Sequence, residues 1–163
     1  MSFLDVCQWL QQTAISTSIR ESLYLFPVIE GAHLLSLSAF LGSALMYDLR
    51  LIGVLWSQDP VLKVKAQFLP VALVGFGCMV TTGVLLFWSE PVALYQSFYF
   101  RIKVLMLALA GLNALIFHLT VDRKAKEWNL SATPPLRARV AGYVSIALWI
   151  GVVTAGRFTA YNV

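Results

Sequence analysis

Long apolar runs alternate with short polar segments along this chain, and the pattern predicts four helices. The runs cover residues 23–47, 68–88, 102–121 and 139–156. Each is long enough to cross a hydrocarbon core of roughly 30 Å, which takes about 20 helical residues at a rise of 1.5 Å each. We therefore expect four membrane-spanning α-helices.

The polar segments between the runs are short and leave little room for a separate soluble domain. Short connections favour neighbouring helices that run in opposite directions, and Pro134 and Pro135 end any helix before the last run. We expect an all-α fold, an integral membrane four-helix antiparallel bundle, with residues 1–163 forming a single transmembrane domain.

The N-terminal segment has a different pattern, in which apolar and polar positions alternate at helical spacing. Phe3, Leu4, Cys7 and Leu10 fall toward one side of a helix, while most of the polar residues fall elsewhere. This amphipathic spacing predicts a short helix over residues 2–14 that lies in the membrane interface. The spacing between Cys7 and Cys78 matches no disulfide or zinc framework, so we expect free thiols.

The composition agrees with a protein whose main surroundings are a lipid bilayer. Hydrophobic residues make up 59% of the chain and charged residues 12%, far from the balance of a soluble domain. Eight basic residues flank the spans on one side and four on the other. Because cytoplasmic loops retain lysine and arginine, both termini are expected outside the cytoplasm, with loops 48–67 and 122–138 inside. Topology and anionic lipid explain the basic charge without a nucleic-acid partner.

Two ionisable residues interrupt the first apolar run, in the stretch FPVIEGAHLL. Glu30 and His33 are three residues apart, so they share one face of a helix, and we expect that face to point into the bundle. A charge at this depth costs about 2.5–3.5 kcal/mol on insertion scales, so such groups usually find a partner. Arg157 follows the last span on the same side and is the expected ion-pair partner of Glu30. A structural pair and a functional carboxylate both fit Glu30.

His33 and His118 are the only histidines, and either can bind a metal or haem iron, hydrogen-bond a quinone or relay a proton. From the predicted inner ends of their spans, their heights differ by about 16 Å, too far for both to ligate one haem iron. Two separate sites fit better. Met79 lies near the height of His33 and Met46 near that of His118, and histidine with methionine is a known axial pair for haem. Methionine is also a common gap-filler in apolar cores. No C-x-x-C-H motif occurs, so any haem is expected to be b-type.

Three short stretches of the sequence resemble motifs of a known protein family. FPVIEGAH, YDLRLIGV and GRFTAY resemble an uncharacterised family of small bacterial four-helix membrane proteins with F-P-x-x-E-x-x-H and D-L-R-L-x-G stretches. The resemblance implies this fold and a bacterial inner membrane, and no activity. A looser similarity of architecture links the chain to cytochrome b561-like and copper-resistance membrane proteins. Within DLRL, Asp48 is expected to accept a hydrogen bond or pair with a basic group, and Arg50 suits a phospholipid phosphate.

Three functions remain open after these observations. The first is a membrane electron-transfer protein that binds b-type haem or is linked to quinone, using His33, His118, Glu30 and Arg157. The second is a haem-free accessory subunit that packs against a larger membrane complex or another copy of itself. The third is a transport or proton-relay protein. No nucleophile with a base and no phosphate-binding glycine loop is visible, which argues against hydrolytic chemistry.

Overall fold

The computed structural model describes residues 2–161, which contain helices and no strand. Four helices are long and apolar enough to cross a membrane: α3 (Leu25–Ile52), α4 (Val61–Ser89), α6 (Phe98–Thr120) and α7 (Leu136–Tyr161). The predicted all-helical fold and its four membrane-length helices are therefore confirmed, and the chain is a multi-pass membrane protein.

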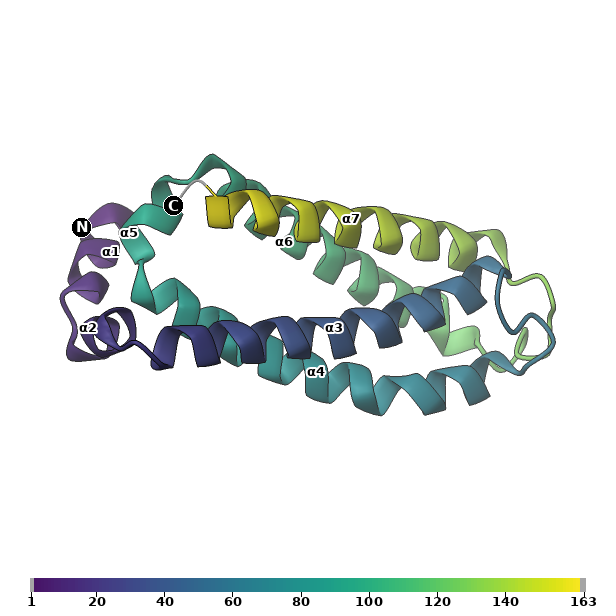
Figure 1. Ribbon diagram of the computed structural model, residues 1–163. Helices are drawn as coiled ribbons and strands as arrows, with labels where there is room; N and C mark the ends of the chain where they lie inside the picture. Colours follow the sequence, from purple (N-terminus) through teal and green to yellow (C-terminus); the bar gives the residue numbers. More distant parts are fainter. Residues whose placement is uncertain (1, 162–163) are drawn as a thin grey trace.

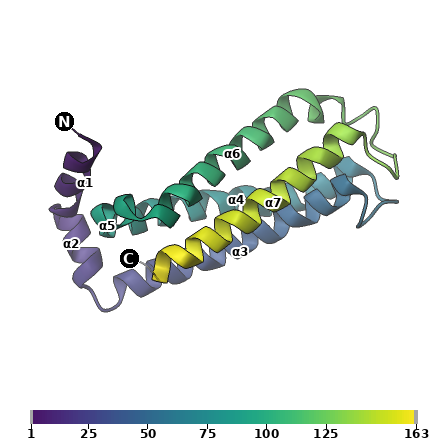
Figure 2. The same ribbon diagram turned by 90° about the horizontal axis from the view of Figure 1, so that it is seen from above.

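The four long helices lie lengthwise beside one another, and the chain reverses direction from each to the next (Figure 1). The α3 helix packs along α4, α6 packs along α7, and α7 also packs against α3 (Figure 2). Their shared core is a cluster of Met79, Ala110, Trp149 and Val152, with Phe40 of α3 packed against it. Residues from all four helices thus meet in one core.

Glycines allow the closest approaches between these helices. A Cβ atom added at Gly75 of α4 would lie 2.8 Å from the backbone nitrogen of Phe40. A Cβ at Gly142 of α7 would lie 3.2 Å from the carbonyl oxygen of Asp48. Small residues at such points let helix backbones meet, which is a common basis of packing inside membranes.

Three short helices cover the end of the molecule at which both termini lie (Figure 1): α1 (Phe3–Gln11), α2 (Ala14–Glu21) and α5 (Pro91–Gln96). The short helix predicted over residues 2–14 is present as α1 but ends earlier, at Gln11, and Thr13 caps α2 by accepting from the Ser16 amide at 3.4 Å. Trp88 donates to the Thr13 hydroxyl at 3.0 Å and so fastens this cap to α4. Cys7 and Cys78 are both free thiols, as expected.

At the opposite end, the loops are tied to the long helices by specific hydrogen bonds. Arg50 is fully buried, and its guanidinium donates to the carbonyl oxygens of Asp59 and Ser131, both at 3.0 Å. Asn129 accepts from the amides of Val61 and Leu62 and so satisfies the first turn of α4. Arg50 therefore holds two loops together and does not lie free for a lipid phosphate.

Candidate functional site

His33 lies in the first part of α3, with its ring against α4. Its Nδ1 atom is 3.1 Å from the Met79 carbonyl oxygen and 3.0 Å from the Thr82 hydroxyl. A carbonyl oxygen can only accept, so Nδ1 carries the proton. The Thr82 hydroxyl donates to the Cys78 carbonyl at 2.7 Å and is free to accept from His33. In the neutral ring, Nε2 therefore keeps its lone pair and can accept a proton or bind a metal.

The position of the His33 ring depends on a glycine in α4. A Cβ atom added at Gly83 would lie 3.2 Å from the ring carbon Cε1. The absence of a side chain at Gly83 thus lets the imidazole lie directly against α4, where its Nδ1 reaches the Met79 carbonyl.

Lys103 of α6 is the second component of the site. Its ammonium is close enough to His33 for an electrostatic interaction, and its aliphatic stem lies 3.7 Å from the Cβ position of Gly156 on α7. The side chain is half-buried and forms no ion pair or hydrogen bond with any described residue. Sequence reasoning counted Lys103 only among the basic residues of the outer side, although a lysine inside the run 102–121 was a signal for it.

The predicted ion pair between Glu30 and Arg157 is not formed. Arg157 donates to the Tyr161 hydroxyl at 2.8 Å, and its guanidinium lies 4.7 Å from the centre of that ring. Glu30 is exposed on the outside of α3 and has no ion-pair partner among the described residues. Tyr161 lies one helical turn from Arg157, so the arginine is satisfied within α7. The expectation that Glu30 faces the bundle interior together with His33 is therefore wrong.

The methionines do not face the histidines as the sequence suggested. Met79 meets His33 only through its backbone carbonyl, and its side chain is buried in the core beside Ala110 and Trp149. The Met79 side chain is thus packed in the core, and no described contact joins its sulfur to the His33 ring. Met46 is half-buried on α3, and no described contact joins it to His118.

His118 lies at the other end of α6 and is exposed. Its Nδ1 is 2.9 Å from the Asp122 carboxylate, which also pairs with Lys65 of α4 at 2.5 Å. This group ties α4 to the C-terminal end of α6. Among residues 2–161, no three histidine, cysteine, aspartate or glutamate side chains are placed to hold a metal ion together.

Comparison with known proteins places the chain in a family without an assigned activity. A family model, described as a family of unknown function (DUF6644), matches residues 23–162. No curated protein and no solved structure matches the chain. The matched range contains all four long helices and leaves out α1 and α2. The protein therefore belongs to DUF6644, and the expected membership of an uncharacterised family is confirmed.

Proposed function

We propose that this DUF6644 protein is a quinone-linked electron-transfer protein whose site binds the quinone head between His33 and Lys103. The observation that carries the proposal is the unpaired ammonium of Lys103 inside a membrane-spanning helix, within electrostatic range of His33. Ionisable groups at such positions are costly and usually pair with another group. Since no described residue pairs with Lys103, a ligand that accepts a hydrogen bond supplies the missing partner.

A quinone head matches both groups of this site. Lys103 donates to a carbonyl oxygen of the oxidised ring, and the Nε2 lone pair of His33 accepts from a hydroxyl of the reduced ring. The hydrogen bonds of His33 Nδ1 to Met79 and Thr82 hold the imidazole in the required tautomer. The two groups come from α3 and α6, so a ligand between them would bridge the two helix pairs. Quinones dissolve in the bilayer and reach such a site laterally.

A b-type haem is the second candidate ligand. Histidines that bind metals usually donate their other ring nitrogen to a carbonyl, as His33 does to Met79, and Lys103 and Arg157 supply cations for the propionates. His33 would be the axial ligand, and the haem would supply a one-electron redox centre. No described side chain is placed to be the second axial ligand of a haem. A quinone needs no such ligand, so it is the preferred candidate.

The proposed setting is a bacterial inner membrane with both termini in the periplasm. The support is the excess of basic residues at the loop end of the bundle, where Lys124, Lys126 and Arg137 are exposed. In this orientation His33 and Lys103 lie in the periplasmic half of the membrane, and α1, α2 and α5 lie at the outer interface.

Two measurements on protein in lipid nanodiscs test the proposal. Titration with decylubiquinone, corrected with empty nanodiscs, should show saturable binding that weakens at least tenfold, about 1.4 kcal/mol, in Lys103→Met. Arg101→Met, which removes an exposed cation of the same helix, should bind like the wild type. Equal binding of decylubiquinone by Lys103→Met and Arg101→Met would contradict the proposed site. An optical spectrum with a Soret band that shifts on reduction would favour haem, and a colourless protein without quinone binding would favour the accessory-subunit function.

A further inference from the structure

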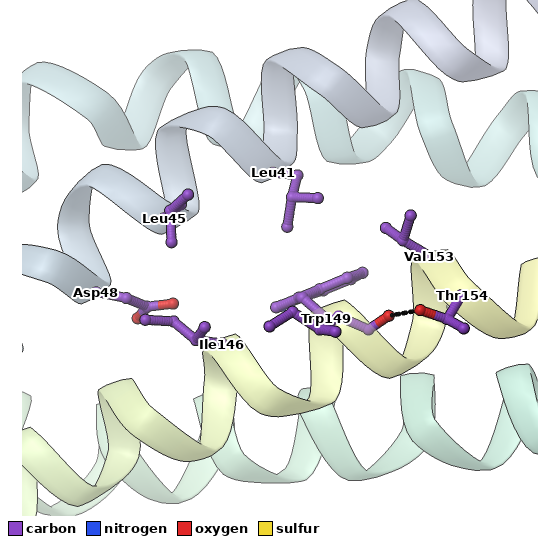
Figure 3. Close-up of a pocket in the computed structure, with 8 residues that line it drawn as sticks. Leu41, Leu45, Asp48, Ile146, Trp149, Val153 and Thr154 are labelled. Atoms are coloured by element: carbon purple, nitrogen blue, oxygen red, sulfur yellow. Dashed lines mark hydrogen bonds between the residues drawn. The ribbon is translucent and has the colours of Figure 1, made fainter.

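A groove separates α3 from α7 along the middle of these two helices (Figure 3). Its volume is about 260 Å³, and its walls are Leu41 and Leu45 of α3 and Ile146, Trp149 and Val153 of α7. The Asp48 carboxyl closes one end, and Thr154 lies at the other (Figure 3). We propose that this groove binds a small lipophilic organic cation, with Asp48 as its counter-ion.

Asp48 is the first reason, because it is a buried acid without a cationic partner. Its residue is 8% exposed, and its carboxyl accepts a hydrogen bond from Ser145 of α7. Among the described residues it forms no ion pair. The nearby Arg50 is turned toward the loops, where it donates to Asp59 and Ser131. An acid buried in a membrane-spanning helix without a charge partner marks a functional position by default.

None of the other charged groups of this end forms an ion pair with Asp48 among the described residues. Lys65 and His118 both pair with Asp122, and Lys63 pairs with Asp59 on the exposed side. The groove therefore offers one carboxyl group as its only charged lining residue. Charge complementarity selects a cation as the occupant.

The other residues that line the groove favour a cation that also carries an apolar group. Trp149 contributes an aromatic ring, and the face of a tryptophan ring attracts a cation. The other lining side chains are aliphatic, except for Thr154, whose hydroxyl already donates to the Ile150 carbonyl at 2.8 Å (Figure 3). A neutral amphiphile would fill the apolar part of the groove and leave Asp48 without a counter-charge.

Size and access narrow the class of ligand further. Pockets for drug-sized ligands measure about 300–1,000 Å³, so a groove of about 260 Å³ holds a small amine or quaternary ammonium and excludes a macrocycle. Ile150 and Val153 are 64% and 40% exposed on the membrane-facing surface. The ligand therefore enters from the bilayer. None of the lining residues belongs to the His33 and Lys103 site, so this inference does not depend on the proposed electron-transfer function.

Benzyltrimethylammonium is a suitable probe, and neopentylbenzene is its uncharged isostere. Binding is measured by calorimetry in nanodiscs of zwitterionic phosphatidylcholine, so that lipid charge does not attract the cation. The wild type should bind the cation saturably and the isostere at least tenfold more weakly. Asp48→Asn should weaken cation binding at least tenfold, whereas Asp59→Asn, which removes a half-buried acid of the same end outside the groove, should leave it unchanged.

A second variant keeps the carboxyl group and fills the groove instead. Thr154 is exposed, so Thr154→Trp is expected to fold, which its thermal unfolding checks, and to weaken cation binding at least tenfold. Absence of saturable binding in the wild type would overturn the proposal. Equal binding of the cation and its isostere, or unchanged cation binding in folded Asp48→Asn or Thr154→Trp, would also overturn it.

Discussion

Arg50 combines full burial with a charge, and its neighbours explain how the chain tolerates this. The guanidinium has lost its water shell and donates instead to the carbonyl oxygens of Asp59 and Ser131, in two different loops. Hydrogen bonds from a charged donor contribute more than neutral ones, about 1.5–3 kcal/mol each. The planar fork of arginine reaches two acceptors that the single ammonium of a lysine does not reach in the same way.

Replacing Arg50 should therefore destabilise the protein. We expect Arg50→Met to lower the free energy of unfolding by about 2–4 kcal/mol, because two carbonyl oxygens lose their donor in a buried place. Arg50→Lys should fall between Arg50→Met and the wild type. Arg137→Met, at an exposed arginine of the same end, should change the stability little. Reversible unfolding in mixed detergent micelles measures all three, and equal stability of Arg50→Met and Arg137→Met would contradict the role assigned to Arg50.

Cys7 is the other residue whose burial has a direct chemical consequence. Cys7 lies in α1 and is 0% exposed, and burial raises the pKa of its thiol above the ordinary value. A raised pKa means less thiolate near pH 7–8, and the thiolate is the reactive form.

We expect Cys7 to react slowly with N-ethylmaleimide in the folded protein. In a Cys78→Ser variant, folded protein should be labelled at least tenfold more slowly at pH 7.5 than protein unfolded in SDS, and labelling should speed up as the pH rises. A cysteine at exposed Ser18, in a variant lacking both native cysteines, provides the control and should be labelled at similar rates in both states. Fast labelling of folded Cys7 would contradict its burial.

The packing of α3 on α4 depends on the glycine at one position of the α4 helix. A Cβ at Gly75 would lie 2.8 Å from the backbone nitrogen of Phe40, which cannot move without shifting α3. A Cβ at Gly77 would meet nothing within 4 Å. The two glycines share a helix and differ in their surroundings, so they form a matched pair.

Substitution by alanine should therefore have opposite effects at these two positions. Gly75→Ala is expected to lower the free energy of unfolding by about 1–3 kcal/mol through overpacking. Gly77→Ala should leave the stability unchanged or raise it by up to about 1 kcal/mol, since alanine favours a helix over glycine. Unfolding of both variants in the same micelles provides the comparison. A loss at Gly77→Ala as large as that at Gly75→Ala would show that the close contact does not limit the packing.

The sequence predicted the long helices but not their ends. The first run was placed at 23–47, whereas α3 extends from Leu25 to Ile52, and α4 begins at Val61, well before the run 68–88. Hydropathy detects the part of a helix that lies in lipid, while the helical hydrogen bonds continue through polar turns beyond it. The break between α1 and α2 and the short helix α5 were missed, because they depend on caps and on contacts with other parts of the fold.

The candidate site could be predicted only in part, because the sequence does not show how the helices face one another. His33 stood out as an ionisable residue in an apolar run, and the structure gives it buried partners on α4. The orientation of Glu30 was not predictable, because α3 is apolar on nearly all sides and no amphipathic pattern shows which face is interior. The ion pair predicted between Glu30 and Arg157 depended on that orientation and is not formed. The unpaired state of Lys103 could be seen only after the four helices were placed.

At the scale of the whole molecule, the two ends of the bundle differ in charge and in construction. One end carries both termini and the cap of α1, α2 and α5, while the other carries the two loops fastened by Arg50 (Figure 1). Not every basic residue of the loop end is a free charge, because Arg50 is buried and Lys65 pairs with Asp122. Lys124, Lys126 and Arg137 remain exposed there and favour retention on the cytoplasmic side.

This orientation can be tested with single cysteines at exposed positions of the two ends, in a variant without native cysteines. Ser18 lies in α2 at the end of the termini, and Ala132 lies in the last loop. In intact spheroplasts, a membrane-impermeant maleimide should label Ser18→Cys and leave Ala132→Cys unlabelled until the membrane is opened with detergent. The reverse pattern would place the termini in the cytoplasm. It would also move His33 and Lys103 to the cytoplasmic half of the membrane and Asp48 to the periplasmic half, because each residue is fixed toward one end of the same four helices.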